Sequence, residues 1–155
     1  MTAEPVWYFD TGVFVTPLLR NHSDAVVASC LDWQQRAAAG AITVVTSALT
    51  WDEVTWVAGR RRATAFDFTA AALVGKRLRT LPGLSWAAVD EKVLDLAGRL
   101  LAEARLRPRD AIHAATALMH ANGRLLTLDG DFPHGQILPD RPPLTVVRLL
   151  DLAAT

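Results

Sequence analysis

Val6-Trp7-Tyr8-Phe9-Asp10-Thr11-Gly12 is the stretch of this sequence that decides the fold. Its first four residues are apolar, aromatic or β-branched without interruption, which is typical of a strand buried on both faces of a parallel sheet. Asp10 and Gly12 end the run because both residue types favour turns. Asp10 also suits the N-cap of a helix beginning near Gly12. The stretch therefore predicts a buried strand with a carboxylate at its carboxyl end.

Three further runs have the character of buried strands, namely Ile42–Val45, Leu125–Leu128 and Leu144–Val147. The segments between them have helical spacing of apolar residues, over about 23–39, 47–62, 64–79, 90–105 and 108–121. Alternating strands and helices imply right-handed crossovers and a sheet covered on both faces. We expect an α/β fold, a three-layer α/β/α domain with a mostly parallel central sheet, and a functional site at the carboxyl ends of its strands.

The composition suits one domain spanning residues 1–155, since 51% of the residues are hydrophobic and 21% are charged. Sixteen basic residues balance sixteen acidic ones, so the whole chain has no general attraction for nucleic acid, and any affinity for RNA must be local. The sequence shows neither the pattern of a signal peptide nor an apolar run long enough to span a membrane. We expect a soluble cytoplasmic protein that does not bind membranes.

Glu53 is the first acidic residue that a structural role explains poorly. On a helix over 47–62 it shares a face with Leu49, Trp56 and Val57. Burying a carboxylate in such an apolar stripe is costly unless another group compensates its charge. Its neighbour Asp52 points elsewhere and is expected to be solvated.

Asp110 repeats this pattern on the helix expected over 108–121. The other residues of its face are Ala114, Ala117, Leu118 and Ala121. Small residues let a helix pack closely on a sheet, so the Asp110 carboxylate should face inward. Its place in the first helical turn is also favoured by the helix dipole, but the dipole does not account for the apolar face.

Asp129-Gly130-Asp131 follows a strand-like run and fits a simple turn as well as a functional site. In the expected fold, Asp10, Glu53, Asp110 and Asp129 meet at one edge of the sheet. Unit charges about 4 Å apart repel by about 4 kcal/mol at an effective dielectric constant near 20. Such a cluster needs raised pKa values or a cation, and carboxylate oxygens suit Mg²⁺ or Mn²⁺.

The histidines do not favour a competing zinc site, because His113 and His120 lie seven residues, or roughly 10 Å, apart along a helix. His113 is one turn from Asp110 and has a second-layer role at the acidic site as one interpretation, but the sequence favours a packing or solvated role. Thr11 and Thr127 are expected in a second layer, where their hydroxyls would hold the carboxylates or an attacking water.

Four segments in order resemble the PIN-domain family, in particular the VapC-type toxins of bacterial toxin–antitoxin pairs. They are Trp7–Gly12, Thr46–Val54, Arg107–Ala117 and Leu126–Phe132, and the resemblance extends from Val6 to about Leu149. The resemblance implies that Asp10, Glu53, Asp110 and Asp129 are the catalytic, metal-binding residues. It favours Asp129 over Asp131 as the direct ligand and leaves Asp131 as an outer ligand or loop residue.

The resemblance also implies an activity and partners. The activity is Mg²⁺- or Mn²⁺-dependent hydrolysis of RNA, with a tRNA or rRNA target, by a toxin that inhibits translation or growth. The partners are a small VapB-like antitoxin and a second copy of the chain. The antitoxin is expected to cover the region 47–80, which contains Trp51, Trp56, Phe66 and Phe68, although these aromatic residues also suit a core.

Two alternatives stay open on the sequence alone. Asp129-Gly130-Asp131 superficially fits a Toprim-like metal-dependent phosphoryl-transfer domain, in which Asp110 would have no role. The second alternative is a catalytically silent PIN-fold interaction module, whose acidic residues are only structural. A haloacid-dehalogenase-like phosphatase is set aside because it needs an acid at position 12, which is Gly12.

Overall fold

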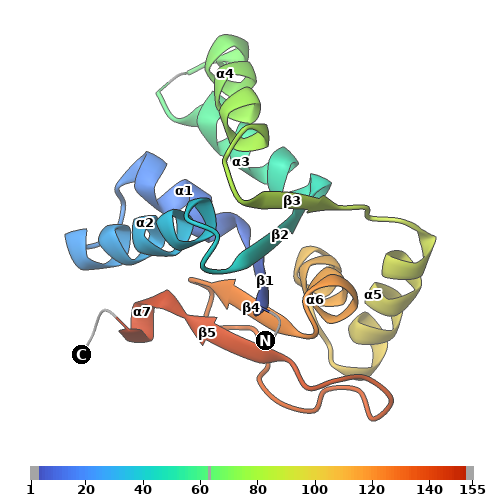
Figure 1. Cartoon of the computed structure of the whole chain (residues 1–155). Helices are drawn as coiled ribbons and strands as arrows, with labels where there is room; N and C mark the ends of the chain where they lie inside the picture. Colours follow the sequence, from blue (N-terminus) through green and yellow to red (C-terminus); the bar gives the residue numbers. More distant parts are fainter. Residues whose placement is uncertain (1–3, 63, 153–155) are drawn as a thin grey trace.

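A five-stranded parallel sheet forms the centre of the computed structural model, which describes residues 4–62 and 64–152 (Figure 1). Its strands are β1 (Val6–Phe9), β2 (Thr43–Ser47), β3 (Leu84–Ala87), β4 (Arg124–Thr127) and β5 (Thr145–Arg148). The order across the sheet is β3-β2-β1-β4-β5, and every neighbouring pair runs parallel. β1 is therefore the central strand, which agrees with its unbroken apolar sequence.

Helices cover both faces of this sheet and complete the expected three-layer α/β/α arrangement (Figure 1). The helices are α1 (Thr11–Leu19), α2 (Asp24–Ala38), α3 (Ala48–Arg60), α4 (Phe68–Arg79), α5 (Glu91–Glu103), α6 (Pro108–His120) and α7 (Leu149–Leu152). α1, α2 and α7 pack on one face, and α5 and α6 pack on the other. α3 and α4 form a pair that projects beyond the sheet on the side of β3 (Figure 1).

Alternation of side chains along the strands divides the core into two parts. The side chains on the α5 and α6 face are those of Tyr8, Val45 and Leu125, and those on the opposite face are Phe9, Val44 and Leu126. All of these residues are at most 9% exposed. The inner strands therefore need apolar residues at consecutive positions, because successive side chains enter the cores on the two opposite faces of the sheet.

Helix α1 contains Pro17, which cannot donate the usual hydrogen bond to the carbonyl of Val13. The side chain of Gln34 on α2 replaces this donor, with Nε2 3.0 Å from the Val13 oxygen. The otherwise unpaired carbonyl is thereby satisfied across two helices. This side-chain bond fixes α1, whose N-cap is Asp10, against α2.

Two glycines allow other groups to pack closely against α3. Gly75 lets α4 approach α3, and Gly59 lets the Phe66 ring lie against α3. A Cβ atom at Gly75 on α4 would lie 2.8 Å from the Thr55 side chain and 2.9 Å from Nε1 of Trp51. Trp51 also donates a hydrogen bond to the Gly75 carbonyl. At Gly59 a Cβ atom would lie only 2.3 Å from the ring of Phe66. Both positions therefore require the absence of a side chain.

The sequence predicted the main elements to within a few residues, with three differences. β3 was not predicted, because its sequence Leu-Ser-Trp-Ala is short and half-exposed at the sheet edge. α7 was also not predicted. The helix expected over 64–79 begins only at Phe68, because Asp67 is its N-cap and accepts a hydrogen bond from the amide of Ala70. Within the described part of the chain, no helix has the length and apolar character needed to cross a membrane.

Leu125→Ala should lower the free energy of unfolding by about 2–5 kcal/mol, because the truncated side chain leaves a cavity beside fully buried neighbours. Leu94→Ala on α5 is the control, since Leu94 is 50% exposed and its truncation should cost less than about 0.5 kcal/mol. Urea unfolding followed by circular dichroism measures both. Equal losses in the two variants would contradict the assignment of Leu125 to the core.

Candidate metal centre

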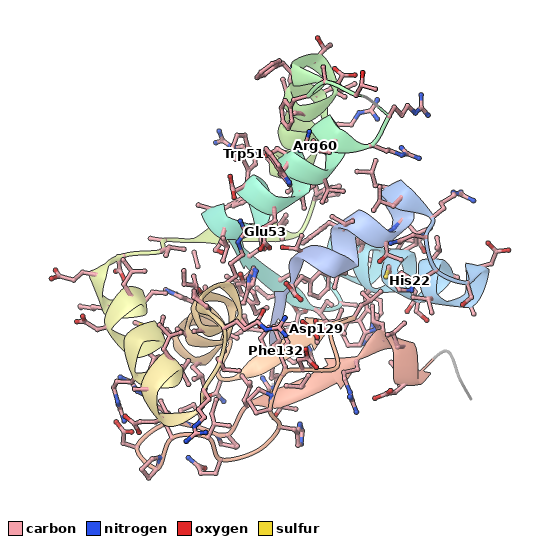
Figure 2. All side chains as sticks on the ribbon, turned by 180° about the vertical axis from the view of Figure 1, so that it is seen from behind. His22, Trp51, Glu53, Arg60, Asp129 and Phe132 are labelled. Carbon is pink, nitrogen blue, oxygen red and sulfur yellow. The ribbon has the colours of Figure 1, made fainter. Side chains whose placement is uncertain are left out.

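The carboxyl ends of β1, β2 and β4 meet at a cavity with acidic walls. Asp10 directly follows β1, α3 begins directly after β2, and Asp129 follows β4 after one intervening residue. The lining residues are Asp10, Thr11, Gly12, Glu53, Trp56, Val57, Arg109, Asp110, His113 and Asp129. Figure 2 shows Glu53 and Asp129 on the same side of the molecule. The cavity has a volume of about 290 Å³.

Asp10 serves both as a helix cap and as a wall of this cavity. Its carboxylate accepts a hydrogen bond from the backbone amide of Thr11 at 2.6 Å and one from the hydroxyl of Thr127 at 2.7 Å. The side chain is only 12% exposed. The capping role anticipated from the sequence is thus real, and it fixes the direction in which the carboxylate points.

Glu53 reaches the same cavity from α3 and is held by three donors. It accepts hydrogen bonds from the Thr11 hydroxyl and from Nε2 of His113, and it forms a 3.4 Å ion pair with Arg109. Burial raises the pKa of Glu53, but the hydrogen bonds and the two cationic neighbours outweigh burial and leave its pKa below the ordinary value. The expected apolar stripe is only partly correct, since Trp56 is 54% exposed at the rim of the cavity.

His113 lies between the Asp10 and Glu53 carboxylates, so the expected packing or solvated role is wrong. Its Nε2 is 3.0 Å from Oε2 of Glu53 and 3.5 Å from Oδ1 of Asp10. Burial lowers the pKa of His113, but the hydrogen bond to Glu53 and the negative charges of Asp10, Glu53 and Asp110 raise it overall. Because the pKa of Glu53 is lowered, the hydrogen between the two side chains belongs to His113.

Tyr8 forms a hydrogen bond with the second ring nitrogen of His113. It was not recognised as a site residue from the sequence. Its hydroxyl is 2.7 Å from Nδ1 of His113 and 3.0 Å from the Ser47 hydroxyl. Tyr8 is fully buried, and burial raises the pKa of the phenol far above its ordinary value, so the hydroxyl keeps its proton. The Tyr8 hydroxyl at Nδ1 and the Glu53 carboxylate at Nε2 hold the His113 ring at both of its nitrogens.

Asp110 is the acid with the least support. It faces the cavity from the first turn of α6, and no hydrogen bond to its carboxylate exists within residues 4–62 and 64–152. Burial raises the pKa of Asp110, and the charges of Asp129 and Asp10 raise it further. The sequence placed this carboxylate inward correctly, and its position in the cavity argues against a Toprim-like arrangement that leaves Asp110 without a role.

Asp129 and Asp131 occupy different environments. Asp129 lines the cavity, and the Thr127 hydroxyl accepts a hydrogen bond from its backbone amide at 2.9 Å. Asp131 is exposed and does not line the cavity, but its backbone amide donates a 2.8 Å hydrogen bond to the Asp129 carboxylate. The backbone of Asp131 therefore orients Asp129, while its own side chain faces solvent.

The donors at this site suit a hard divalent cation. Asp10, Glu53 and His113 each present a potential ligand atom, and these atoms lie within 4.8 Å of one another. Because Nε2 of His113 carries a hydrogen directed at Glu53, the carboxylate oxygens are the donors that are free for a cation. Oxygen donors favour Mg²⁺ or Mn²⁺ over softer metals.

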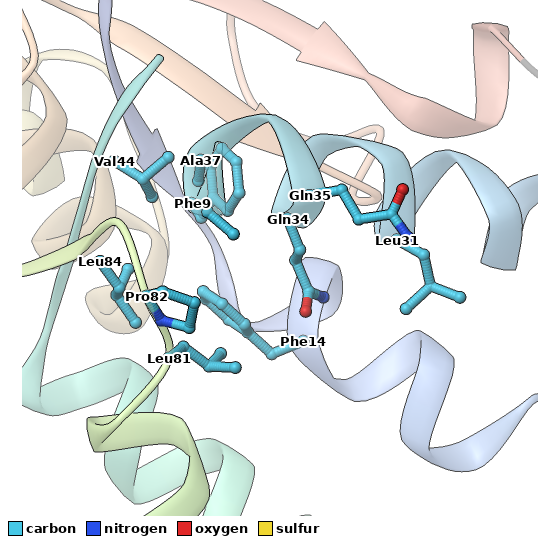
Figure 3. A pocket seen from close by; sticks show the side chains of 11 residues that line it. Phe9, Phe14, Leu31, Gln34, Gln35, Ala37, Val44, Leu81, Pro82 and Leu84 are labelled. Atoms are coloured by element: carbon cyan, nitrogen blue, oxygen red, sulfur yellow. The ribbon is translucent and has the colours of Figure 1, made fainter. Parts of the chain in front are cut away.

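A second cavity has a different chemical character. Figure 3 shows it between α1, α2 and the segment that leads into β3. Its walls are apolar apart from Gln34 and Gln35, and none of the lining residues is charged. It offers no group for acid–base or ionic chemistry.

Tyr8→Phe should lower the free energy of unfolding by about 1–3 kcal/mol, because it leaves the buried Nδ1 of His113 without its hydrogen-bond partner. Urea unfolding measures the loss, and ¹⁵N NMR of the His113 ring reports the change in its protonated nitrogen. Leu94→Ala again serves as a surface control. An unaltered ring spectrum and unaltered stability would show that Tyr8 does not fix His113.

Three solved structures have folds similar to this chain. A chain of VapBC2 from Rickettsia felis, bound to a promoter DNA fragment, aligns with a TM-score of 0.62 and 15% identity over 92% of this chain and 98% of that one. DNA-bound VapBC from Salmonella typhimurium aligns with a TM-score of 0.57 and 16% identity over 94% and 98%. A toxin–antitoxin complex from Klebsiella pneumoniae gives 0.56 and 21% over 81% and 88%. At these identities the similarity concerns the fold.

Sequence comparison with curated proteins finds no match. A family profile for the PIN domain, however, matches residues 7–137. The matched range contains all four acids of the cavity together with Tyr8 and His113, and it covers most of the chain. The profile, the parallel three-layer fold and the acidic cavity at the strand ends agree, and the chain belongs to the PIN-domain family.

Proposed function

We propose that this PIN-domain chain is a metal-dependent endoribonuclease and the toxin of a toxin–antitoxin pair. The observation that carries the proposal is the unsupported carboxylate of Asp110, which shares one cavity with Asp10, Glu53 and Asp129. Burial raises the pKa of Asp110, and the charges of Asp129 and Asp10 raise it further; a cation bound among these acids would offset that repulsion. Membership in a family of nucleases supports the same function.

The four carboxylates are proposed to hold Mg²⁺ or Mn²⁺. When bound, such a cation lowers the pKa of a water molecule and offsets charge on a phosphodiester. Thr127 and Thr11 fix the Asp10 and Glu53 carboxylates through hydrogen bonds, so these two acids are oriented before any ligand arrives. Asp131 contributes only its backbone amide, which orients Asp129.

Arg109 is proposed to contact the phosphate of the substrate. Its side chain is 64% exposed at the cavity and is held by Glu53 at 3.4 Å. A guanidinium group binds phosphate oxygens through paired hydrogen bonds, and its exposure leaves donors available for this. The cation and Arg109 together counter the repulsion between the acids and an anionic RNA backbone.

The proposed partners are a VapB-like antitoxin and a second copy of the chain, and the proposed target is a tRNA or rRNA. Fold similarity to chains from toxin–antitoxin complexes supports an antitoxin partner. Exposed apolar side chains on α3, α4 and β3 provide surface for protein contacts, since Trp51, Leu73 and Trp86 are 37–49% exposed.

Purified chain without partner should cleave a pool of structured cellular RNAs in Mg²⁺ or Mn²⁺ and should be inactive in EDTA. Asp110→Asn should reduce cleavage to the EDTA level, because it removes a charged donor to the cation while preserving the shape of the side chain. Gel analysis of the RNA measures the reaction. Equal cleavage by the wild type in EDTA and in Mg²⁺ would rule out a metal-dependent nuclease.

Asp129→Asn and Asp131→Asn form a matched pair of variants. They test whether Asp129 is the metal ligand and Asp131 only a loop residue. The first should abolish metal-dependent cleavage because Asp129 lines the cavity, and the second should keep most of it because the exposed Asp131 acts through its backbone. Initial cleavage rates with one RNA substrate give the comparison. Loss of activity only in the Asp131 variant would reverse these two assignments.

Metal binding should also be visible in thermal stability. The raised pKa of Asp110 means that folding disfavours its charged form, so this group lowers stability as the pH rises through its folded-state pKa. In EDTA at neutral pH, Asp110→Asn should therefore melt a few degrees above the wild type. Added Mg²⁺ should stabilise the wild type more than the variant. Equal Mg²⁺ effects on both melting temperatures would remove Asp110 from the site.

A further inference from the structure

A row of aromatic side chains begins in the acidic cavity and continues along the outer surface of the α3–α4 pair. Trp56 lines the cavity and is 54% exposed. The Phe66 ring lies 5.4 Å from the Trp56 ring, and the Phe68 ring lies 5.0 Å from Phe66. Phe68 is 78% exposed, so burial within this chain does not account for its presence. We call Trp56, Phe66 and Phe68 the aromatic row.

The aromatic row is held in place by the backbone around it. The absence of a side chain at Gly59 lets the Phe66 ring lie directly on α3. The Gly59 carbonyl accepts a 2.8 Å hydrogen bond from the amide of Asp67, which ties the segment between the helices to α3. Asp67 in turn caps α4, whose first residue is Phe68. The rings therefore form a preorganised surface, which reduces the entropic cost of binding a partner.

Cationic groups flank the aromatic row. The guanidinium carbon of Arg60 lies 5.0 Å from the centre of the Trp56 ring, and Arg61 and Arg62 are exposed directly after it. Figure 2 shows α3 extending from Glu53 at the cavity to Arg60. Arg109 is exposed at the cavity itself. Because the whole chain has balanced charge, this positive group is a local feature of the surface.

We propose that the aromatic row stacks unpaired bases of an RNA beside the phosphate that occupies the acidic cavity. The inference rests on the proposed nuclease function and assigns Trp56, Phe66 and Phe68 as the residues that contact the bases of its substrate. The exposed side chains of Trp56 and Phe68, next to arginines, match the two parts of an unpaired nucleotide, a flat base and an anionic phosphate. Paired bases in a duplex do not offer their faces to such a surface. A purely apolar protein partner does not require the flanking arginines.

The experiment measures RNA binding without cleavage, using the Asp110→Asn protein in Mg²⁺, where this variant is expected not to cleave RNA. Fluorescence anisotropy follows three labelled RNA hairpins with the same stem: one with an unpaired loop, one with abasic residues in that loop, and one extended into a duplex. Each is titrated with Asp110→Asn protein and with versions also carrying Trp56→Leu, Trp56→Phe or Trp86→Leu. Trp86 is the matched control, since it is 37% exposed and lies outside the acidic cavity. Thermal melts establish that each variant is folded.

Trp56→Leu should weaken binding of the looped hairpin by about 5- to 150-fold, the range for loss of stacking on one base. Trp56→Phe should retain most of the affinity because it keeps an aromatic face, and Trp86→Leu should retain all of it. The abasic loop should bind the Asp110→Asn protein weakly and should be insensitive to Trp56→Leu.

Unchanged affinity of the Trp56→Leu protein for the looped hairpin, or equal binding of intact and abasic loops, would overturn the stacking role and assign the aromatic row to another occupant, such as a protein partner. If wild-type chain still cleaves RNA in Mg²⁺, this failure leaves the proposed function intact. Absence of both RNA binding and metal-dependent cleavage would overturn the two proposals together.

Discussion

Electrostatic repulsion among carboxylates at one edge of a parallel sheet is the constraint on which this structure depends. The topology brings Asp10, Glu53, Asp110 and Asp129 together because each follows a strand end or lies on a helix that packs there. Asp10 and Glu53 are stabilised by the hydroxyls of Thr127 and Thr11 and by the N–H of His113. Among the residues that the structure describes, Asp110 has no such donor. The cavity thus combines two acids held by hydrogen bonds with one whose pKa is raised by burial and by the charges of Asp129 and Asp10.

Four of the five strands were predictable because a strand that is buried on both faces has a continuous run of apolar residues. Val6–Phe9 must satisfy two layers at once, and its residues are accordingly all apolar. β3 lacks such an apolar run. It lies at the edge of the sheet, pairs with β2 alone, and its Trp86 is partly exposed. Helix ends were less predictable because capping depends on single side chains such as Asp67. The sequence also cannot show that Trp56 lies at a cavity rim rather than in the core.

The acidic residues of the site were predictable, but the groups that support them were not. Asp110 and Glu53 stand out locally because a carboxylate on an apolar helix face needs an explanation. Tyr8 and His113 looked like ordinary core residues, and their contact joins positions 105 residues apart. A signal was nevertheless present, because His113 lies one helical turn after Asp110 on a face of small residues. The difference between Asp129 and Asp131 depends on the path of a turn, which spacing alone does not determine.

The hydrogen bond from Gln34 to the Val13 carbonyl has a consequence for cooperativity. Because Pro17 interrupts the hydrogen bonding of α1, a side chain on α2 completes it, and neither helix can detach without exposing an unpaired polar group. We therefore expect α1 and α2 to open together in local unfolding. Asp10 caps the start of α1, so the same opening releases a wall of the acidic cavity. The position of the Asp10 carboxylate in the acidic cavity thus depends on the hydrogen bond between Gln34 and the Val13 carbonyl.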